Sequence, residues 1–312
     1  MPLSDEVTVV LTTSFTVACP STALIEATLS SFAFVPGLEQ CRTVIVADGF
    51  LISTRRRIKM GRLLPEDETP YREYIEALRT RIRAAKGEAA LPASEGVAPG
   101  GVLPEGVPPG HGLPAALANA VVLPLEGHHG FGWAIKAALE SGLVATRHIL
   151  VVQHDRCFMR PFDLARASRC MAADDRIRYL LLPTRSTRNH AQTIASRCGG
   201  AKLPHIVVNG AQLLQLGFWW DSTHLATAEH YLDFVFRERC VKRGTFPEDT
   251  LGRQLLSDVK RGGVRAADRY HAWLWAEPVG GDEGGDERVV GHLNGAHWRC
   301  WALTEESTLC AK

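Results

Sequence analysis

The sequence has neither a surplus of charge of one sign nor a long apolar run. Its 35 Lys and Arg residues nearly balance 34 Asp and Glu residues, which leaves a formal net charge of +1. This balance gives no sign of nucleic-acid binding or of strong attraction to an anionic membrane, so any basic site must be local. No apolar stretch reaches the ~20 residues that cross a bilayer, and we expect no transmembrane segment.

Paired cysteines and a secretory leader are missing as well. The eight cysteines are scattered and none forms a C-x-x-C pair, which argues against a zinc site of paired cysteines. A chain of 312 residues does not need disulfides to fold, so we expect reduced, mostly buried thiols. The opening MPLSDEVTVVL has an acidic pair where a signal peptide carries basic residues. Together these features predict a cytoplasmic protein.

Several specific catalytic signatures are also absent. The sequence contains no G-x-x-x-x-G-K-[ST] phosphate loop, no G-x-S-x-G nucleophile turn and no H-E-x-x-H metal motif. A function therefore has to be inferred from looser patterns.

Short apolar runs alternate with segments of helical spacing. The runs predict strands over residues 7–11, 43–47, 120–125, 148–152, 178–182 and 205–208, with short aromatic strands over 272–275 and 289–293. Helices are predicted over residues 21–32, 71–86, 131–141, 224–236 and 248–259. This alternation predicts an α/β fold with a mainly parallel, twisted sheet flanked by helices, and a small antiparallel element near the C-terminus.

One stretch interrupts this pattern. Residues 87–115 are rich in Gly and Pro, and they cannot hold a helix or a central strand, because Pro lacks a backbone donor and Gly costs chain entropy. Since the strand–helix rhythm resumes beyond it, we interpret the stretch as a flexible insertion within a single domain over residues 1–312. It is either a lid over a site or a dispensable surface loop.

Ligands bind outside the carboxyl ends of the strands in such sheets, which directs attention to polar residues after each strand. Asp155 follows the apolar run 148–152, where a carboxylate is partly desolvated and open to a ligand. Mg²⁺ and Mn²⁺ prefer oxygen ligands and commonly bridge carboxylates to substrate phosphates, so Asp155 is a candidate metal ligand. The alternative is an Asp that caps the next turn.

Three residues at a strand end or a helix start are candidates for nucleotide binding. Asp48 ends the second strand and suits a ribose, although it equally suits an Asx turn. Gly132 and Lys136 lie near the start of the predicted helix 131–141, where backbone amides and a positive charge can receive phosphate.

Two clusters in the C-terminal half carry further chemistry. Asp249, with Glu248 beside it, follows a Gly-Thr-Phe-Pro turn and could act as general base toward an acceptor hydroxyl, unless the two acids only cap the helix. His292 and Arg299 lie in the segment GHLNGAHWR, whose histidines and arginine suit a metal and a diphosphate. A lone histidine on a strand is otherwise an ordinary polar residue.

Residues 217–224 (GFWWDSTH) place three aromatic side chains beside polar groups. Sugars bind by stacking on aromatic rings while polar groups hold their hydroxyls. The two tryptophans equally suit core anchors for the segment that follows.

The order of these features resembles that of GT-A glycosyltransferases, and most of all the large inverting glycosyltransferase family 2. VTVVLTTSF, a helix and then TVIVADGF resemble the opening of that fold, which implies that Thr12, Ser14 and Asp48 hold the nucleotide. The segment that ends in VVQHD resembles the strand before the D-x-D motif. FPEDTLG resembles the downstream E-D motif, which implies that Asp249 is the base. HLNGAHWRCW is partly similar to H-x-x-G-x-x-K-P-W, in which the His, here His292, binds the metal.

Two departures from the family pattern bear on the chemistry. Gln153 replaces the first Asp of D-x-D, which leaves Asp155 as the carboxylate of the motif and makes metal binding weaker, differently composed or absent. Trp298 stands where the retaining pattern has Lys, so Arg299 would have to hold the phosphate. The second departure favours inversion.

We therefore expect a glycosyltransferase that moves a sugar from a nucleotide-diphosphate donor to a hydroxyl of a glycan, protein or small-molecule acceptor, assisted by Mn²⁺ or Mg²⁺. Two alternatives stay open. Gln153 keeps possible a degenerate protein that binds glycan or nucleotide without turnover. A sugar nucleotidyltransferase would need a Gly-rich basic loop after the first strand, which LTTSFTVACP lacks.

Overall fold

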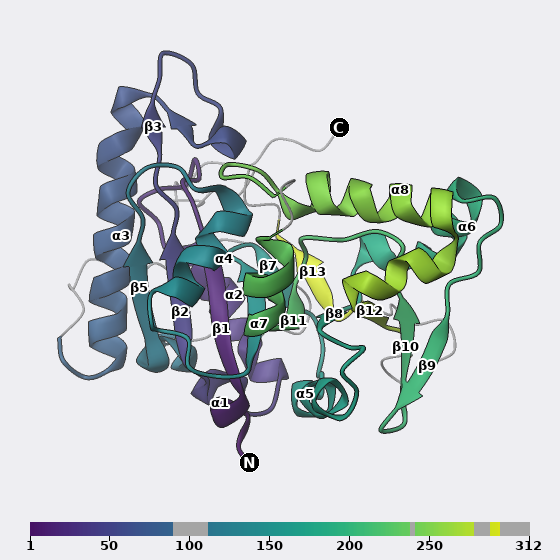
Figure 1. Ribbon diagram of the computed structural model, residues 1–312. Coiled ribbons are helices and arrows are strands. Elements are labelled where there is room, and N and C mark those ends of the chain that lie inside the picture. The colour runs from purple at the N-terminus through teal and green to yellow at the C-terminus, as the bar shows by residue number, and fades with distance from the viewer. Residues whose placement is uncertain (90–111, 238–240, 278–287, 294–312) are drawn as a thin grey trace, which may run out of the picture.

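The computed structural model describes residues 1–89, 112–237, 241–277 and 288–293. Their central feature is a nine-stranded sheet, drawn in Figure 1. In spatial order its strands are β5 (Ala120–Pro124), β2 (Thr43–Ala47), β1 (Val7–Thr13), β6 (His148–Gln153), β11 (His224–Thr227), β8 (Tyr179–Leu181), β12 (Ala272–Trp275), β10 (Ala211–Gln215) and β9 (His205–Val208).

Most strands of this sheet point the same way. β5, β2, β1 and β6 pair in parallel. β11 is antiparallel to both of its neighbours, so β8 again follows the direction of β6, and β12 pairs in parallel with β8. β10 is antiparallel to β12 and to β9. All residues of β1 are buried, as expected for a strand rich in Val and Thr that is covered on both faces.

Helices cover both faces of the sheet, and the sheet separates the core into two clusters. Val9 and Leu11 of β1 belong to the cluster under α2, α3 and α5, whereas Val10 belongs to the cluster under α4, α6 and α8. This alternation is the period of a strand, whose successive side chains point to opposite faces. The helices are α1 (Leu3–Glu6), α2 (Ala23–Ser30), α3 (Pro65–Ala85), α4 (Gly130–Glu140), α5 (Leu164–Ala173), α6 (His190–Arg197), α7 (Ala228–His230) and α8 (Arg253–Gly262).

Two small sheets complete the described structure. β7 (Arg156–Phe158) follows β6 directly and pairs antiparallel with β13 (Val290–His292), which carries the C-terminal segment back to the end of β6. β3 (Leu51–Ile52) and β4 (Arg62–Leu63) form a short parallel pair beyond the end of β2.

The predicted fold class is confirmed: the sheet is mainly parallel, helices flank it, and the small antiparallel element is the β7–β13 pair. Most of the predicted insertion, residues 90–111, lies outside the described residues, and the single domain over residues 1–312 stays a prediction.

The helix predicted over residues 224–236 is wrong in its first part. Residues 224–227 form β11 in the middle of the sheet, and helical structure begins only at Ala228. Tertiary packing overrides the local pattern here, since His224, Leu225 and Ala226 are fully buried between β6 and β8. The imidazole of His224 is accommodated because Nδ1 lies 2.6 Å from the Ser222 carbonyl oxygen and Nε2 lies 2.7 Å from the Tyr231 hydroxyl.

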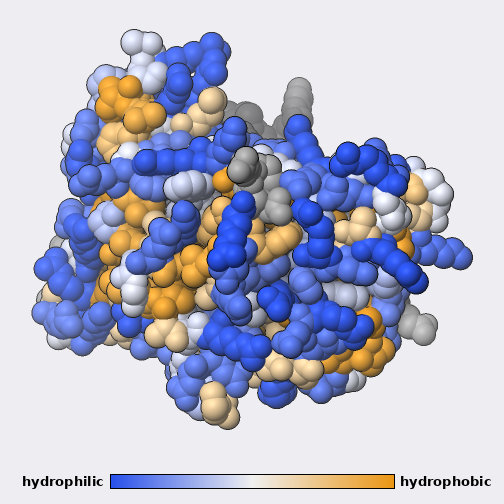
Figure 2. All heavy atoms as spheres, in the orientation of Figure 1, coloured by the Kyte–Doolittle hydropathy of each residue, from blue (hydrophilic) through white to orange (hydrophobic). Residues whose placement is uncertain are grey.

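Hydrophilic residues cover much of the face shown in Figure 2, with apolar patches between them. Among the described residues, no helix combines the length and the apolar character that a membrane span requires.

Buried histidines, among them His190, His224 and His230, make the stability of this fold sensitive to acid. Burial lowers the pKa of His190 to about 4, and burial lowers the pKa values of His224 and His230 to about 3. Between pH ~6.5 and these values the unfolded chain binds protons that the folded chain does not, so the free energy of unfolding falls as the pH decreases. At pH 5 each histidine is expected to cost about 2 kcal/mol.

Urea unfolding at pH 7.5 and pH 5.0 measures this loss. In His190→Gln the amide can still accept the Gly217 N–H that now donates to Nε2 over 3.1 Å, and we expect the pH-dependent loss to shrink by about 2 kcal/mol. His205 is exposed, and His205→Gln should leave the loss unchanged. The same loss in His190→Gln as in the wild type would contradict this explanation. Burial also raises the pKa of Asp221, which increases the free energy of unfolding as the pH falls and so opposes the effect of the histidines. The readout is therefore the difference between each variant and the wild type.

Candidate functional site

A crevice opens at the carboxyl ends of β1 and β6. The chain passes from β1 to β2 and β5 on one side and returns to β6 on the other, and α/β sheets bind ligands where the strand order reverses in this way. A cavity of about 150 Å³ lies at this point. Its polar lining includes Thr12, Thr13 and Ser14 at the end of β1, Asp48 after β2, and Gln153 and His154 at the end of β6.

Aromatic side chains give the cavity an apolar wall. The rings of Phe131 and Phe246 stack with centroids 6.1 Å apart. Phe50 and Phe15 both meet Tyr71 edge to face, with centroids 5.7 and 6.1 Å away. All five side chains line the cavity. Flat rings beside hydroxyl groups suit a ligand with a planar apolar face and a polar edge, such as a nucleobase.

A chain of hydrogen bonds fixes the ring of His154 at the cavity. Nδ1 of His154 lies 2.8 Å from the Thr13 hydroxyl and accepts the Ser14 N–H over 3.4 Å. Since this N–H can only donate, the neutral ring carries its proton on Nε2. The Tyr74 hydroxyl lies 2.8 Å from Thr13 Oγ1 and continues the chain. Burial lowers the pKa of His154, so the ring is neutral at neutral pH and offers a donor rather than a charge.

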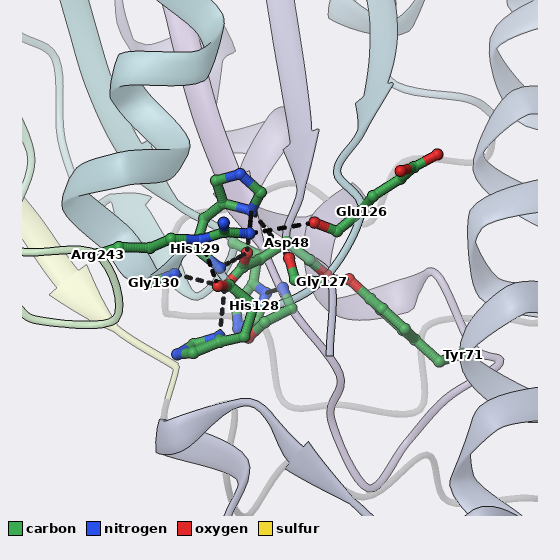
Figure 3. A network of polar contacts seen from close by, with 10 residues as sticks. Asp48, Tyr71, Glu126, Gly127, His128, His129, Gly130 and Arg243 are labelled. Carbon is green, nitrogen blue, oxygen red and sulfur yellow. Dashed lines mark hydrogen bonds and ion pairs between the residues drawn. The ribbon is translucent and has the colours of Figure 1, made fainter. Parts of the chain in front are cut away.

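Asp48 holds the loop that begins helix α4 (Figure 3). One carboxylate oxygen accepts the His129 N–H over 2.8 Å, and the other accepts the Gly130 N–H over 2.9 Å. Nδ1 of His128 lies 2.9 Å from the second oxygen. Asp48 therefore caps the helix, while its own carbonyl oxygen accepts the Tyr71 hydroxyl over 2.6 Å. The predicted ribose ligand lines the cavity, but both of its oxygens already have backbone partners.

Arg243 ties the same loop to the segment before α8. Its guanidinium donates to the carbonyl oxygens of His128 over 2.9 Å and of Glu126 over 3.3 Å, as Figure 3 shows. Close packing in this loop requires glycine at two places. A Cβ on Gly49 would lie 2.3 Å from the Gly127 carbonyl oxygen, and Gly130 has a φ of +75°. The loop is thus fixed from several sides before any ligand binds.

The predicted phosphate ligands on α4 do not reach the cavity. Gly132 packs against Pro247, where an added Cβ would lie 3.0 Å from the proline ring. The Lys136 ammonium lies 4.4 Å from the centre of the Trp133 ring and 3.6 Å from the Glu140 carboxylate. Because Asp48 already occupies the start of the helix, α4 offers little to a phosphate.

The two predicted metal ligands lie side by side although 137 residues separate them in the sequence. Pairing of β13 with β7 places His292 opposite Arg156, and Nε2 of His292 lies 2.9 Å from Oδ2 of Asp155. The Leu293 N–H also donates to the Asp155 carbonyl oxygen over 2.8 Å, which fixes the crossing. No group of three or more His, Cys, Asp or Glu side chains suited to a metal occurs within the described residues. A cation held by Asp155 and His292 would therefore need further ligands from elsewhere.

Gln153 connects the end of β6 to two acids from later in the chain, Asp221 and Glu248. Its side-chain amide donates to the Asp221 carbonyl oxygen over 2.5 Å. Asp221 and Glu248 then exchange hydrogen bonds, since the Asp221 N–H donates to Glu248 Oε2 over 3.1 Å and the Glu248 N–H donates to Asp221 Oδ2 over 3.0 Å. A carboxylate in place of Gln153 could not donate to a carbonyl oxygen. The hydrogen bond to Asp221 thus explains why a glutamine, and not an acid, suits position 153 in this structure.

Of the two adjacent acids that the sequence analysis singled out, only Glu248 turns inward. Burial raises the pKa of the Glu248 carboxyl, and the positive charge of Arg156 acts against that rise. The Asp249 side chain is 65% exposed and lies 3.6 Å from Arg253 on the next turn. Asp221 belonged to the predicted sugar-binding segment 217–224 but was not singled out as an acid, although burial raises its pKa well above the usual range. The sequence signal that could have identified Asp221 was its position directly after two tryptophans.

The remaining candidates fall outside the cavity or outside the described residues. Arg299 lies in the undescribed segment 294–312. Trp219 is fully buried and its ring packs at a tilt of 40° against Tyr179 with centroids 4.0 Å apart, so it is a core anchor rather than a sugar platform.

Comparisons with known proteins find matches among solved structures only. No protein-family model and no curated protein matches the chain. Among solved structures, a CMP-2-keto-3-deoxy-manno-octonic acid synthetase with CTP is 10% identical and has a TM-score of 0.38, and the match covers 86% of this chain and 88% of that one. Glucosyl-3-phosphoglycerate synthase from Mycobacterium tuberculosis, with Mn²⁺, UDP and glucosyl-3-phosphoglycerate, is 13% identical, with coverage of 85% and 68% and a TM-score of 0.37.

S. aureus TarS with UDP-GlcNAc is 14% identical, with a TM-score of 0.35, and the match covers 73% of this chain but only 47% of that one. All of these TM-scores are below 0.5, so the function has to rest on the residues of the site.

The cap formed by Asp48 predicts a loss of stability on substitution. Asp48→Ala leaves the amides of His129 and Gly130 without their acceptor and should lower the free energy of unfolding by about 1–3 kcal/mol. Asp48→Asn should lose less, because its amide oxygen can still accept one N–H. Urea unfolding at pH 7.5 measures both effects. Asp175→Ala, at a side chain that is 86% exposed, should change stability by less than ~0.5 kcal/mol. An Asp48→Ala protein as stable as this control would rule out the cap.

The bridge from Gln153 predicts that an acid at this position lowers the stability of the protein. Gln153→Glu removes the donor to Asp221 and sets a carboxylate against a carbonyl oxygen, so we expect a loss of about 1–3 kcal/mol in unfolding free energy. Thermal and urea unfolding test this, with Gln192→Glu on the surface as the matched control. Unchanged stability of Gln153→Glu would show that the bridge is unimportant.

Proposed function

We propose that this protein transfers a sugar from a nucleoside diphosphate donor to an acceptor hydroxyl. The observation that carries the proposal is the position of the aromatic cavity at the strand-order reversal, at the end of the strand that leads into the Asp155–His292 pair. The Gln153 bridge then connects this strand end to Glu248 through Asp221. The cavity for the nucleobase, the Asp155–His292 pair for the diphosphate and the candidate general base Glu248 thus lie around the end of one strand.

The nucleoside is assigned to the cavity. Phe131 and Phe246 provide a face for the base, and the hydroxyls of Thr12 and Ser14 lie at the end of β1. His154, neutral and with its proton on Nε2, can donate to a base carbonyl or to a phosphate oxygen. The ribose would meet backbone groups beside Asp48 rather than a free carboxylate, because the oxygens of Asp48 already hold the α4 loop.

The diphosphate is assigned to Asp155 and His292. A carboxylate oxygen and an imidazole nitrogen suit Mn²⁺, and Asp155 also suits Mg²⁺. The pair fits a cation whose other ligands come from the diphosphate and water, since two protein ligands alone make an incomplete set. Such a cation would stabilise negative charge on the leaving diphosphate.

Glu248 is assigned as the general base. The acceptor oxygen attacks the anomeric carbon from the face opposite the diphosphate, the bond from that carbon to the phosphate oxygen breaks with its electron pair on the oxygen, and the acceptor proton passes to Glu248. The single displacement inverts the anomeric centre. Partial burial raises the pKa of Glu248, which makes it a better proton acceptor, and the transfer rate should fall as acid protonates it. The acceptor is a glycan, protein or small molecule, and a cytoplasmic location stays a prediction.

A matched pair of substitutions tests the assignment of the base. Glu248→Gln keeps an oxygen for the Asp221 N–H but removes the base, so transfer should fall at least about 100-fold while donor affinity stays within about threefold. Asp249→Asn, at an exposed side chain, should keep transfer within about threefold. Release of nucleoside diphosphate from UDP-, GDP- and TDP-sugars in the presence of mixed hydroxyl acceptors measures both.

The reverse result, with Asp249→Asn inactive and Glu248→Gln active, would assign the base to Asp249. Donor binding without turnover in the wild type would instead support a binding protein that has lost its activity.

A further inference from the structure

A local basic surface stands out on a chain whose net charge is only +1. Residues 51–63, here named the basic loop, run from β3 through a short 3₁₀ turn (Ile58–Met60) to β4 and lead into α3. In Figure 1 the basic loop projects beyond the carboxyl ends of the parallel strands, beside the start of α3. The loop contains no Asp or Glu, and its basic residues are Arg55, Arg56, Arg57, Lys59 and Arg62.

One of these five residues is used to hold the loop in place. Arg56 pairs with Asp67 in the first turn of α3, with Nε 2.7 Å from a carboxylate oxygen, and Asp67 also accepts the Leu64 N–H over 3.0 Å. The other four basic side chains are exposed and form no ion pair with another described residue. Their charge is therefore presented to the surroundings on a loop that is anchored at its base.

Exposed aliphatic side chains lie among these charges. Leu51 is 53% exposed, and Ile52 and Met60 are each 48% exposed. They are three of the seven large apolar side chains that are exposed in the described part of the chain. Figure 2 shows an apolar patch bordered by hydrophilic residues over this loop. Single exposed apolar side chains are ordinary, but three on one charged, projecting loop indicate a surface that meets an apolar and anionic partner.

We infer that the basic loop docks onto the surface of an anionic lipid bilayer. Its four free cations match acidic lipid headgroups, and Leu51, Ile52 and Met60 can enter the boundary between headgroups and acyl chains. A soluble phosphate polymer would match the charge but would leave the aliphatic side chains in water, so the combination favours a bilayer. The net charge of the whole chain hides this site because acidic residues elsewhere balance it.

Docking in this way places the mouth of the cavity at the membrane surface. Ile58, Lys59, Gly61 and Leu63 of the basic loop also line the cavity. The inference rests on the charge and exposure of the loop and does not depend on the proposed transfer reaction.

Co-sedimentation of the full chain with vesicles tests the inference. With about 0.1 M NaCl, we expect binding to phosphatidylcholine vesicles that contain phosphatidylserine to be at least about tenfold tighter than to pure phosphatidylcholine, and to weaken as salt increases. The double variant Arg55→Glu/Arg57→Glu and the double variant Leu51→Ser/Ile52→Ser should each weaken binding at least about tenfold. These four residues do not line the cavity, so nucleotide binding should be unchanged in both variants.

Matched controls make the same changes elsewhere on the surface. Lys202→Glu/Lys260→Glu repeats the change of charge, and Val207→Ser removes an apolar side chain that is 69% exposed. Both controls should bind vesicles like the wild type. Equal affinity for neutral and acidic vesicles, equal losses in the controls, or binding to polyphosphate without binding to vesicles would each overturn the inference. A failure of vesicle binding with intact nucleotide binding would overturn the docking and leave the proposed function standing.

Discussion

The gap between the carboxyl ends of β1 and β6 is the constraint on which the rest of the site depends. The chain leaves β1 toward β2 and β5 and returns on the other side of β1 as β6, so the loops after the two strands diverge. The cavity opens at this edge of the sheet, where residues at the ends of β1 and β6 meet Asp48, Phe131 and Phe246 from other parts of the chain. β7 and β13 then fold the C-terminal segment back to the same edge, which brings His292 to Asp155.

The acids around this gap divide into two kinds. Asp48 accepts two backbone N–H groups at the start of α4, and Asp221 accepts one, that of Glu248, at the start of the helical segment that carries Glu248. Asp155 pairs with the ring of His292, and Glu248 is partly buried and accepts one N–H from Asp221. Gln153 acts together with Asp221 in fixing the chain, because its side-chain amide donates to the Asp221 carbonyl oxygen.

Most strands and the edge of the sheet that holds the site could be predicted from the sequence, because buried apolar runs and the polar residues after them follow from the chain alone. The partner of each polar residue could not. Whether Glu248 or Asp249 turns inward depends on the rotation of a short π-helical turn, and neighbouring acids look alike in sequence. Lys136 was placed at a phosphate site because the sequence does not show that Asp48, far away in the chain, already caps that helix. A helix was predicted for the residues of β11 because only their burial between two strands makes them extended.

Calorimetric titration of nucleoside diphosphates, with and without Mn²⁺, tests the central claim most directly. We predict that one of UDP, GDP, CDP or TDP binds the wild-type protein, that Mn²⁺ tightens binding, and that Asp155→Ala removes the effect of Mn²⁺. Ser14→Trp, which fills the cavity at the end of β1, should abolish binding, whereas Lys136→Ala, on the far side of α4 against Trp133, should leave it unchanged. Binding that survives Ser14→Trp, or no binding of any nucleoside diphosphate, would contradict the placement of a donor nucleotide in this crevice.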